Sequence, residues 1–510
     1  MSFFDRFLDK TKEFDNTTRG LFLGAPEAEA ESLNQSAMLL NEVFIQDSNV
    51  FADLSHEKFI ITGRKGSGKS AIANYIMLSA KNESNVFVDF VKQTEVSLQK
   101  AVQIGAENFQ YVDMGILFQW IVLYKIISLF AQNERLSSQR YYEYLKKFVS
   151  DNDDFSILDQ YKITDFVSQR NCEIDISALK AFGKIKGVDS LQTIRKKMPF
   201  YEMIPHLKNV VKALGWTINQ YKDETEYYIF FDDLDNDFKS NEDSCKENLL
   251  SLIRTAKDFN AVFSEFEFVK IKVILLLRDD IKNYLLANAD VAKVFASYST
   301  GISWFSDELY RKRPNDLLIK KFIDKRIDYG FKRLNYENKP NIRCWEDFIK
   351  VPFKDVLDYT FYTPRDLLLF FKPITENSYS IPLLQESISD LFNKYCDAMI
   401  DEIKSLLSIY FSLQEINCIL SILESELLNT DADSEYLSKL LNEKIHEDST
   451  LEILLNASVI GWRQEGSGYV YFKHREKIGE DIPTEMPEDY RITLHRAVKN
   501  YFIRHKNRPR

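Results

Sequence analysis

Short apolar runs recur along the chain, and segments of a different period separate them. The runs are rich in β-branched and aromatic residues and cover residues 59–62, 85–90, 227–231, 271–277 and 298–305. Such runs are typical of parallel strands that are buried on both faces. The intervening segments place apolar residues three or four positions apart, as helices that pack on one face do. Strands that alternate with helices predict an α/β fold with a parallel sheet.

The longest apolar stretch runs from Gly115 to Ala131 and is interrupted by Gln119 and Lys125. It is shorter than the ~20 residues that a membrane-spanning helix needs, so we expect a buried helix and no membrane association. This helix would belong to a mostly helical insertion of about residues 100–220. The expected elements of the insertion are helices at 110–132, 136–149 and 200–214 and a hairpin at 173–186.

Composition narrows the class of protein. With 45% hydrophobic and 28% charged residues, the chain of 510 residues is expected to fold rather than to be disordered. A net charge of −11 disfavours non-specific binding of polyanions by the whole molecule. The five cysteines are far apart and none has CxxC spacing, which predicts reduced thiols in a cytoplasmic protein rather than a zinc site or a disulfide framework. Residues 1–6 carry charge too early for a secretory signal.

The most informative segment is GRKGSGKS, residues 63–70, which matches GxxxxGK[ST] and is called the glycine loop below. It follows the apolar run at 59–62 and precedes helical spacing at 71–77, so a strand, the loop and a helix come in the order that the motif requires. Glycines let successive N–H groups turn toward an anion, and the helix adds the positive end of its dipole. The predicted nucleotide-binding residues are Gly63, Arg64, Lys65, Gly66, Ser67, Gly68, Lys69, Ser70 and Ala71.

Hydrolysis needs a metal-holding acid and a polarised water in addition to a binding loop. Lys69 is expected to reach the β- and γ-phosphates of ATP, and the Ser70 hydroxyl is expected to bind Mg²⁺. Asp232 and Asp233 follow the run at 227–231, at the end of a strand where ligands bind in open α/β sheets. We expect Asp232 to hold Mg²⁺ through water and Asp233 to orient or deprotonate the attacking water.

Three motifs resemble those of one superfamily. GRKGSGKS at 63–70, FFDDLD at 230–235 and LLLRDD at 275–280 are similar to the Walker A, Walker B and sensor-1 regions of additional-strand P-loop ATPases. The likeness is to the AAA+/STAND group, including origin-recognition-type and KAP-type ATPases and uncharacterised bacterial ATPases with the string GRKGSGKSA. It implies a catalytic set of Lys69, Asp232, Asp233, Arg278 and Arg365, with the two arginines sensing the γ-phosphate.

Arg365 enters this set because YTPRDLL, residues 362–368, resembles the sensor-2 segment of AAA+ lids, and Pro364 suits the first turn of a helix. The chain departs from the AAA+ pattern at two positions. Asp233 stands where Glu is more usual, and Arg278 stands where many AAA+ proteins have Asn, Ser or Thr. Both departures resemble slow STAND switches more than fast motors. Arg311 and Arg313 are candidates for an arginine finger.

Other P-loop classes fit less well. The sequence has no LSGGQ-like signature, which disfavours ABC transporters, and no NKxD motif, which favours ATP over GTP. The resemblance implies four regions: an N-terminal arm at 1–57, an ATPase core at 58–310, a helical lid at 311–380 and a winged-helix-like domain at 381–510.

Within the last region, Ser412 and Glu415 form a capping box that precedes an apolar stripe. The stripe consists of Ile416, Ile419, Leu420 and Leu423. A short helix is expected at 434–445, followed by a hairpin that pairs residues 458–463 with residues 469–474.

The leading hypothesis is a cytoplasmic Mg²⁺-dependent ATPase that acts as a homo-oligomeric switch, and the resemblance implies a place in a bacterial defence system. One alternative is an ATP-regulated DNA-binding or loading factor, because the predicted hairpin and the tail at 491–510 are basic. The basic residues of the hairpin are Arg463, Lys473, His474, Arg475 and Lys477. The helix at 434–445 is electrically balanced, which does not favour reading of base edges. A further alternative is a nucleotide-bound scaffold with negligible turnover that works with a separate protein effector, as resemblance to defence-associated bacterial ATPases suggests.

Overall fold

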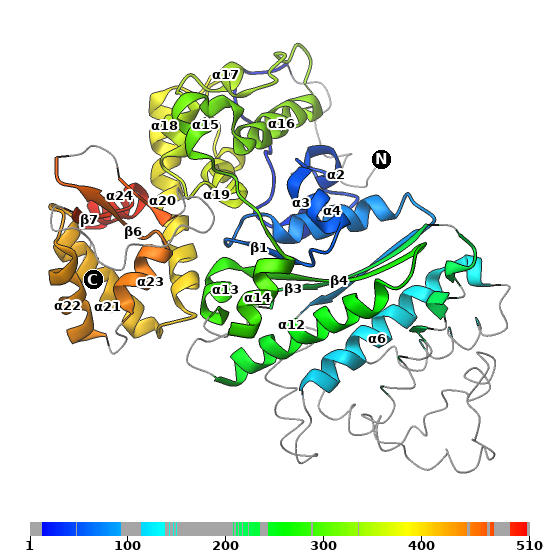
Figure 1. The fold of residues 1–510 in the computed structure, drawn as a ribbon. Helices are drawn as coiled ribbons and strands as arrows, with labels where there is room; N and C mark the ends of the chain where they lie inside the picture. Colours follow the sequence, from blue (N-terminus) through cyan, green and yellow to red (C-terminus); the bar gives the residue numbers. More distant parts are fainter. Residues whose placement is uncertain are drawn as a thin grey trace, which may run out of the picture. The chain divides into compact units, whose positions relative to one another are not determined.

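The computed structural model divides the chain into two compact units, which are described separately (Figure 1). The sheet unit contains residues 49–62 and 72–300, and the helical unit contains residues 1–48, 63–71 and 301–510. The structure describes residues 13–46, 48–92, 114–137, 224–234, 243–286, 289–334, 336–445, 449–466, 470–473 and 490–506, with scattered positions between 142 and 222. The predicted hairpin at 173–186 and most of the predicted helices at 136–149 and 200–214 lie outside the described residues.

A parallel sheet forms the centre of the sheet unit, as the apolar runs predict. Over the described residues its strands have the order β2-β3-β4-β1-β5. Their bounds are Ile60–Gly63 for β1, Val86–Lys92 for β2, Thr225–Asp232 for β3, Val269–Arg278 for β4 and Ser299–Gly301 for β5. The register pairs Val86 of β2 with Glu226 of β3, and Phe231 of β3 with Leu275 of β4. The fifth strand is shorter than the predicted run because Tyr298 ends the preceding helix.

The direction of the crossovers explains which helices cover which face of the sheet. The connection from β1 to β2 runs one way along the sheet, whereas those from β2 to β3 and from β3 to β4 run the other way. Right-handed crossovers therefore place α4, Lys69–Ala80, opposite α6, Met114–Gln132, and α12, Asp243–Phe263. Figure 1 shows α6 and α12 side by side along the sheet, and both contact strands and each other. The remaining elements are α3 (Ser48–Ser55), η2 (Glu134–Leu136), α13 (Asp279–Leu285) and α14 (Ala289–Tyr298).

The long apolar helix α6 is a core helix of the sheet unit. Among the described residues it is the one helix that is long and apolar enough to cross a membrane. Its segment Gly115–Gln132 is, however, 67% buried within the structure. Its aromatic side chains pack on the sheet; the ring of Phe130 meets that of Tyr227 edge-on at 4.8 Å. The interrupting Lys125 is paired with Asp89 of β2, Nζ to Oδ2 3.1 Å. This burial agrees with the expectation of a buried helix.

The helical unit has one hydrophobic core that extends from Leu21 to Phe502. The elements before α20 are α1 (Ala28–Glu31), α2 (Leu40–Val43), α15 (Asp307–Lys312), η4 (Pro314–Asp316), α16 (Leu318–Arg333), α17 (Trp345–Phe348), α18 (Phe353–Leu357), α19 (Pro364–Phe371) and η5 (Lys372–Thr375). Those that follow are α20 (Gln385–Leu407), α21 (Leu413–Leu427), α22 (Ser434–Lys444), α23 (Thr450–Asn456), β6 (Ile460–Gln464), β7 (Tyr490–Leu494) and α24 (Arg496–His505). The predicted region boundary at residue 380 falls within this shared core.

Local sequence signals account for several of these helix ends. The side chain of Ser412 accepts from the backbone N–H of Glu415, the Glu415 carboxylate accepts in return, and α21 begins there, so the capping box is confirmed. The predicted stripe of α21 is buried. Thr363 caps α19 and Pro364 occupies its first turn. These helices begin where side chains satisfy backbone groups that the first turn leaves without partners.

The strand pairing near the C-terminus differs from the prediction. Residues 458–463 were expected to pair with 469–474, but β6 pairs antiparallel with β7. A single bridge between Trp462 and Tyr471 lies in the expected hairpin, of which residues 467–469 and 474 are outside the described part. The alternating residues of β7 bury Ile492 and Leu494 against the core of the helical unit, which favours this more distant partner.

The N-terminal segment is attached to the helices of its own unit. Residues 16–18 make backbone hydrogen bonds with residues 379–381, and Leu21 and Leu23 enter the core. The carboxylate of Glu31 receives two hydrogen bonds from the Arg326 guanidinium, Nη1 to Oε1 2.6 Å and Nη2 to Oε2 2.7 Å. Both side chains are buried. This buried ion pair fixes the N-terminal segment on α16.

Candidate functional site: the glycine loop and its neighbours

The glycine loop has the backbone shape that its sequence predicts. β1 is fully buried and ends at Gly63, and α4 begins at Lys69. Between them Gly66 has φ +80° and Gly68 has φ +95°, values that side chains with a Cβ rarely adopt. These left-handed residues turn the chain sharply between a strand and a helix. The loop therefore combines a glycine-made curve with a helix N-terminus, the arrangement that binds phosphate.

Neighbouring atoms approach two of these glycines closely. A Cβ on Gly63 would lie 2.4 Å from Ser67 Oγ, and a Cβ on Gly66 would lie 2.8 Å from the Cβ of Arg365. Contacts this short would force the neighbouring side chains to shift, so close packing favours glycine at both positions. The crowding at Gly66 also shows that a second segment of the helical unit lies directly against the loop.

Lys69 and Ser70 begin the helix that follows the loop. The Lys69 ammonium donates to the carbonyl oxygens of Gly63, at 2.9 Å, and of Arg64, at 3.2 Å. Its charge therefore lies against the loop backbone, the position from which it is expected to reach phosphate. Ser70 and Ala71 occupy the first turn of α4. Of the predicted binding residues, all nine belong to one continuous strand–loop–helix segment.

Trp304 supports the loop from the chain that follows β5. Its indole Nε1–H donates to the carbonyl oxygen of Ser67 at 2.7 Å, and its ring lies 4.0 Å from the position of a Cβ on Gly68. Ser67 is buried. Sequence analysis included Trp304 only as part of a predicted strand, because an isolated tryptophan carries no signal for such a role.

The structure brings Arg365 to the loop. Its backbone N–H donates to the carbonyl oxygen of Gly66 at 3.4 Å, and its Nε donates to the carbonyl oxygen of Pro26 at 3.3 Å. Arg365 lies in the first turn of α19, where Thr363 and Pro364 fix the start of the helix. Its backbone thus contacts the loop, while its guanidinium contacts the Pro26 carbonyl and lies 3.8 Å from Oε2 of Glu402 on α20.

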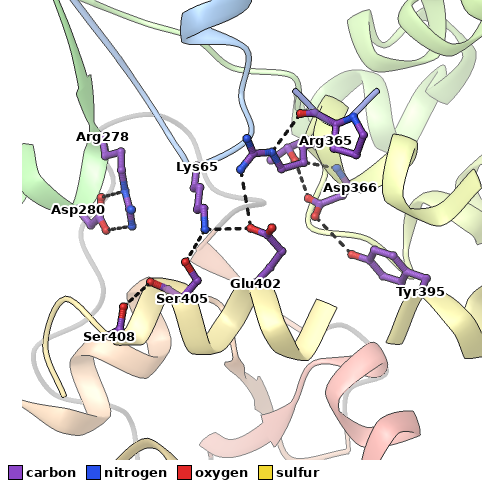
Figure 2. Close-up of polar contacts among 11 residues, drawn as sticks. Lys65, Arg278, Asp280, Arg365, Asp366, Tyr395, Glu402, Ser405 and Ser408 are labelled. Carbon is purple, nitrogen blue, oxygen red and sulfur yellow. Dashed lines mark hydrogen bonds and ion pairs between the residues drawn. The ribbon is translucent and has the colours of Figure 1, made fainter. Parts of the chain in front are cut away.

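Lys65 joins the loop to the C-terminal part of α20, as Figure 2 shows. Its ammonium lies 3.0 Å from Oε2 of Glu402 and donates to Oγ of Ser405 at 2.8 Å. The same Glu402 oxygen is 3.8 Å from Nη1 of Arg365. Sequence analysis did not identify Glu402 or Ser405, since both stand on an ordinary amphipathic helix more than 300 residues from the loop in sequence.

Arg64 makes a second connection to the C-terminal part of the helical unit. Its Nη1 donates to Oγ of Ser458 at 3.2 Å, and its Nη2 donates to the carbonyl oxygen of Ala457 at 3.4 Å. Ala457 directly follows α23 as its C-cap, so a cation meets the negative end of that short helix. Ser458 has φ +57°, a left-handed conformation that is uncommon for serine.

A buried acid lies close to these cations. Asp366 accepts from the Thr363 hydroxyl at 2.6 Å, and the Tyr395 hydroxyl lies 3.5 Å from its other oxygen. Burial raises the pKa of Asp366 to about 6, which the Thr363 hydrogen bond and the positive charge of Arg64 partly oppose. The negative charge of Glu402 acts in the same direction as burial. Asp366 is therefore a group that titrates in mildly acidic solution.

The predicted acids occupy the end of β3 in the sheet unit. Asp232 is the last residue of β3 and is buried. The backbone N–H of Asp233 donates to Oδ1 of Asp232 at 2.9 Å. Asp233 has φ +57°, a conformation that aspartate tolerates better than most residues. The strand thus ends in a sharp turn at the two acids. Asp235 lies outside the described residues.

Arg278 forms an ion pair with Asp280, two residues further along the chain. Its Nε donates to Oδ1 of Asp280 at 3.0 Å, and its Nη2 donates to Oδ2 of the same carboxylate (Figure 2). Arg278 ends β4 and Asp280 lies in the first turn of α13. The side chain is 6% exposed, so the pair is largely shielded from solvent. A role in sensing phosphate would require this bidentate pair to open.

The candidate arginine fingers are exposed and paired locally. Arg311 lies 2.9 Å from Asp307, and Arg313 lies 3.3 Å from Asp316. Neither contact assigns a role to either residue.

Several basic residues that suggested DNA binding are paired with acids. Arg463 is hydrogen bonded to Asp431, Arg491 lies 3.3 Å from Glu465, and Arg504 lies 3.2 Å from Asp397. His474, Arg475 and Lys477 lie outside the described residues. Pairing lowers the positive charge that these arginines present to phosphates.

No protein-family model, no curated protein and no solved structure matches this chain at a significant level.

Proposed function

We propose that this chain is a magnesium-dependent ATP-binding and hydrolysing switch of the AAA+/STAND type. The observation that carries the proposal is the glycine loop itself. It joins a buried strand to a helix, it turns at two glycines of positive φ, and Arg365 is hydrogen bonded to it. A polyphosphate is the ligand that such a loop recognises through backbone N–H groups and a lysine.

The residues fit a nucleotide with its metal. Gly66 and Gly68 adopt positive φ, which lets the backbone of the loop turn its N–H groups toward an anion. Ser70 and Asp232 would hold the Mg²⁺, because hydroxyl and carboxylate oxygens are the ligands that it prefers. When bound, Mg²⁺ neutralises charge on the phosphate oxygens.

Four other side chains complete the proposed chemistry. Lys69 binds the β- and γ-phosphates, and Asp233 orients or deprotonates the attacking water. Arg365 senses the γ-phosphate from the start of α19. Arg278 is a second sensor that has to leave Asp280 to act.

The strand order supports the additional-strand class within the P-loop proteins. β4 lies between β1, which leads into the glycine loop, and β3, which ends at Asp232. One strand thus separates the loop-bearing strand from the acid-bearing strand, as the name of the class implies. The finer organisation follows the resemblance: an insertion at about 100–220, a helical lid at 311–380 and a winged-helix-like region at 381–510. We propose that the switch is cytoplasmic and forms a homo-oligomer when ATP binds.

Turnover of Mg²⁺-ATP by purified variants tests the proposal. Lys69→Ala is expected to lower ATP binding and turnover together, whereas Asp233→Asn is expected to lower turnover while binding is retained. Lys81→Ala is a matched control, since Lys81 is an exposed lysine just beyond α4. Hydrolysis that is unchanged in both Lys69→Ala and Asp233→Asn would reject the assignment. Binding of ATP without any turnover in the unmodified protein would favour the scaffold alternative.

A further inference from the structure

Glu402 brings a carboxylate to the glycine loop from α20. Its Oε2 lies 3.0 Å from Lys65 Nζ and 3.8 Å from Arg365 Nη1. One carboxylate oxygen is thus shared by a cation of the loop and a cation of α19 (Figure 2). Because the Glu402 side chain is 37% exposed, the two cations explain its position better than packing does.

The two cations that hold Glu402 are suited to hold phosphate oxygens. Lysine and arginine bind carboxylates and phosphates through the same charge-assisted hydrogen bonds. Lys65, Arg365 and Glu402 have side-chain exposures of 24%, 26% and 37%. Exchange of one anion for another at these groups therefore requires no opening of a buried core.

We infer that the Glu402 carboxylate competes with the terminal phosphate of ATP for Lys65 and Arg365, so that ATP binding and the Lys65–Glu402 contact exclude each other. The inference rests on the proposed function and concerns regulation of the same loop. Under this inference, Glu402 lowers the affinity for ATP. Because Glu402 is part of α20, binding of ATP at the loop also changes the contacts of that helix.

The contacts of α20 show which parts of the helical unit a change at the loop would reach. Lys65 also donates to Ser405, one turn beyond Glu402, so a single lysine anchors two positions of α20. α20 packs against α19 and α24 along the core of this unit. Loss of both Lys65 contacts would release the C-terminal part of α20 from the loop, while the Arg64 contacts with Ala457 and Ser458 remain.

The affinity for a fluorescent Mg²⁺-ATP analogue provides the first test. Glu402→Gln keeps the size of the side chain and removes the competing charge, so it is expected to bind the analogue roughly threefold to tenfold more tightly. Asp401→Asn is the matched control, because Asp401 is an exposed neighbour on α20 and its loss changes the net charge equally. Equal or weaker binding by Glu402→Gln, with an unchanged thermal transition, would overturn the inference.

Carbodiimide coupling provides a second test, because it measures the contact between Lys65 and Glu402 directly. The reagent activates a carboxyl group, an adjacent amine attacks it, and an amide forms as the urea leaves. Lys65 and Glu402 are close enough to be joined, and mass spectrometry of the digested protein identifies the product. Saturating Mg²⁺-ATP is expected to lower its yield severalfold. An unchanged yield in protein that binds ATP refutes the inference alone, whereas a wild-type protein that does not bind ATP refutes the proposed function.

Discussion

The backbone N–H of Arg365 donates a hydrogen bond to the carbonyl oxygen of Gly66 over 3.4 Å, which joins the first turn of α19 to the centre of the glycine loop. This contact places an arginine beside the loop by means of backbone atoms alone. The position of Arg365 is therefore fixed by the path of the chain, while its guanidinium contacts the Pro26 carbonyl and Glu402.

Gly66→Ala is expected to destabilise the helical unit and to weaken ATP binding. Alanine at φ +80° costs roughly 1–2 kcal/mol, and its Cβ would in addition lie 2.8 Å from that of Arg365. Gly466→Ala separates the two effects, since Gly466 has φ +79° with no atom near its Cβ position. Urea unfolding should show a larger loss for Gly66→Ala. Equal losses would mean that the contact with Arg365 contributes nothing.

The buried ion pair between Glu31 and Arg326 should be important for stability. Glu31→Gln leaves a buried guanidinium without its charge partner and is expected to lower the free energy of unfolding by about 3–5 kcal/mol. Glu308→Gln serves as the control, because the Lys312–Glu308 pair is 72% exposed on both sides and should contribute less than about 1 kcal/mol. Thermal and urea unfolding of both variants measure the difference. A loss below that of the control would contradict the prediction.

Stability should depend on pH through Asp366. Burial raises its pKa from the ordinary 3.8 to about 6, so between these values the folded chain binds more protons than the unfolded chain. The contribution of Asp366 to stability is therefore greatest below pH 4 and is lost as the pH rises through about 6, by roughly 3 kcal/mol in total. Asp366→Asn should lack this decline.

Urea unfolding at several pH values between 4 and 7 measures the effect as the difference between wild type and Asp366→Asn. Arg64→Ala should move the decline to higher pH, because the charge of Arg64 lowers the pKa of Asp366. Asp401→Asn removes an exposed acid of the same unit and controls for the loss of one negative charge. Parallel curves for wild type and Asp366→Asn would show that Asp366 does not titrate in this range.

Short sequence patterns predicted much of the fold and, within the site, the glycine loop itself. The strand, loop and helix around residues 59–77 follow from apolar runs and a contiguous motif, and the capping box at Ser412 fixes the start of α21. The residues that hold the loop have no such signal. Trp304, Glu402 and Ser458 reach it from distant parts of the chain, through tertiary packing that periodicity does not encode. The same limit explains why the sequence predicted only the nearer segment 469–474 as a partner of β6. The structure has one bridge to that segment, at Tyr471, and a full antiparallel pairing with β7.

The indole of Trp304 offers the most direct probe of how the loop is supported. Trp304→Phe keeps an aromatic ring against Phe322, with which Trp304 packs edge-on at 5.6 Å, but removes the N–H that donates to the Ser67 carbonyl. A lost hydrogen bond of this kind is worth about 1 kcal/mol, so ATP affinity should fall roughly fivefold as the loop loses its fixed shape. Trp216→Phe, at a 48% exposed position of the sheet unit, should leave the affinity unchanged. If the two variants bind ATP equally well, the Ser67 carbonyl needs no support from the indole and the loop holds its shape through its glycines alone.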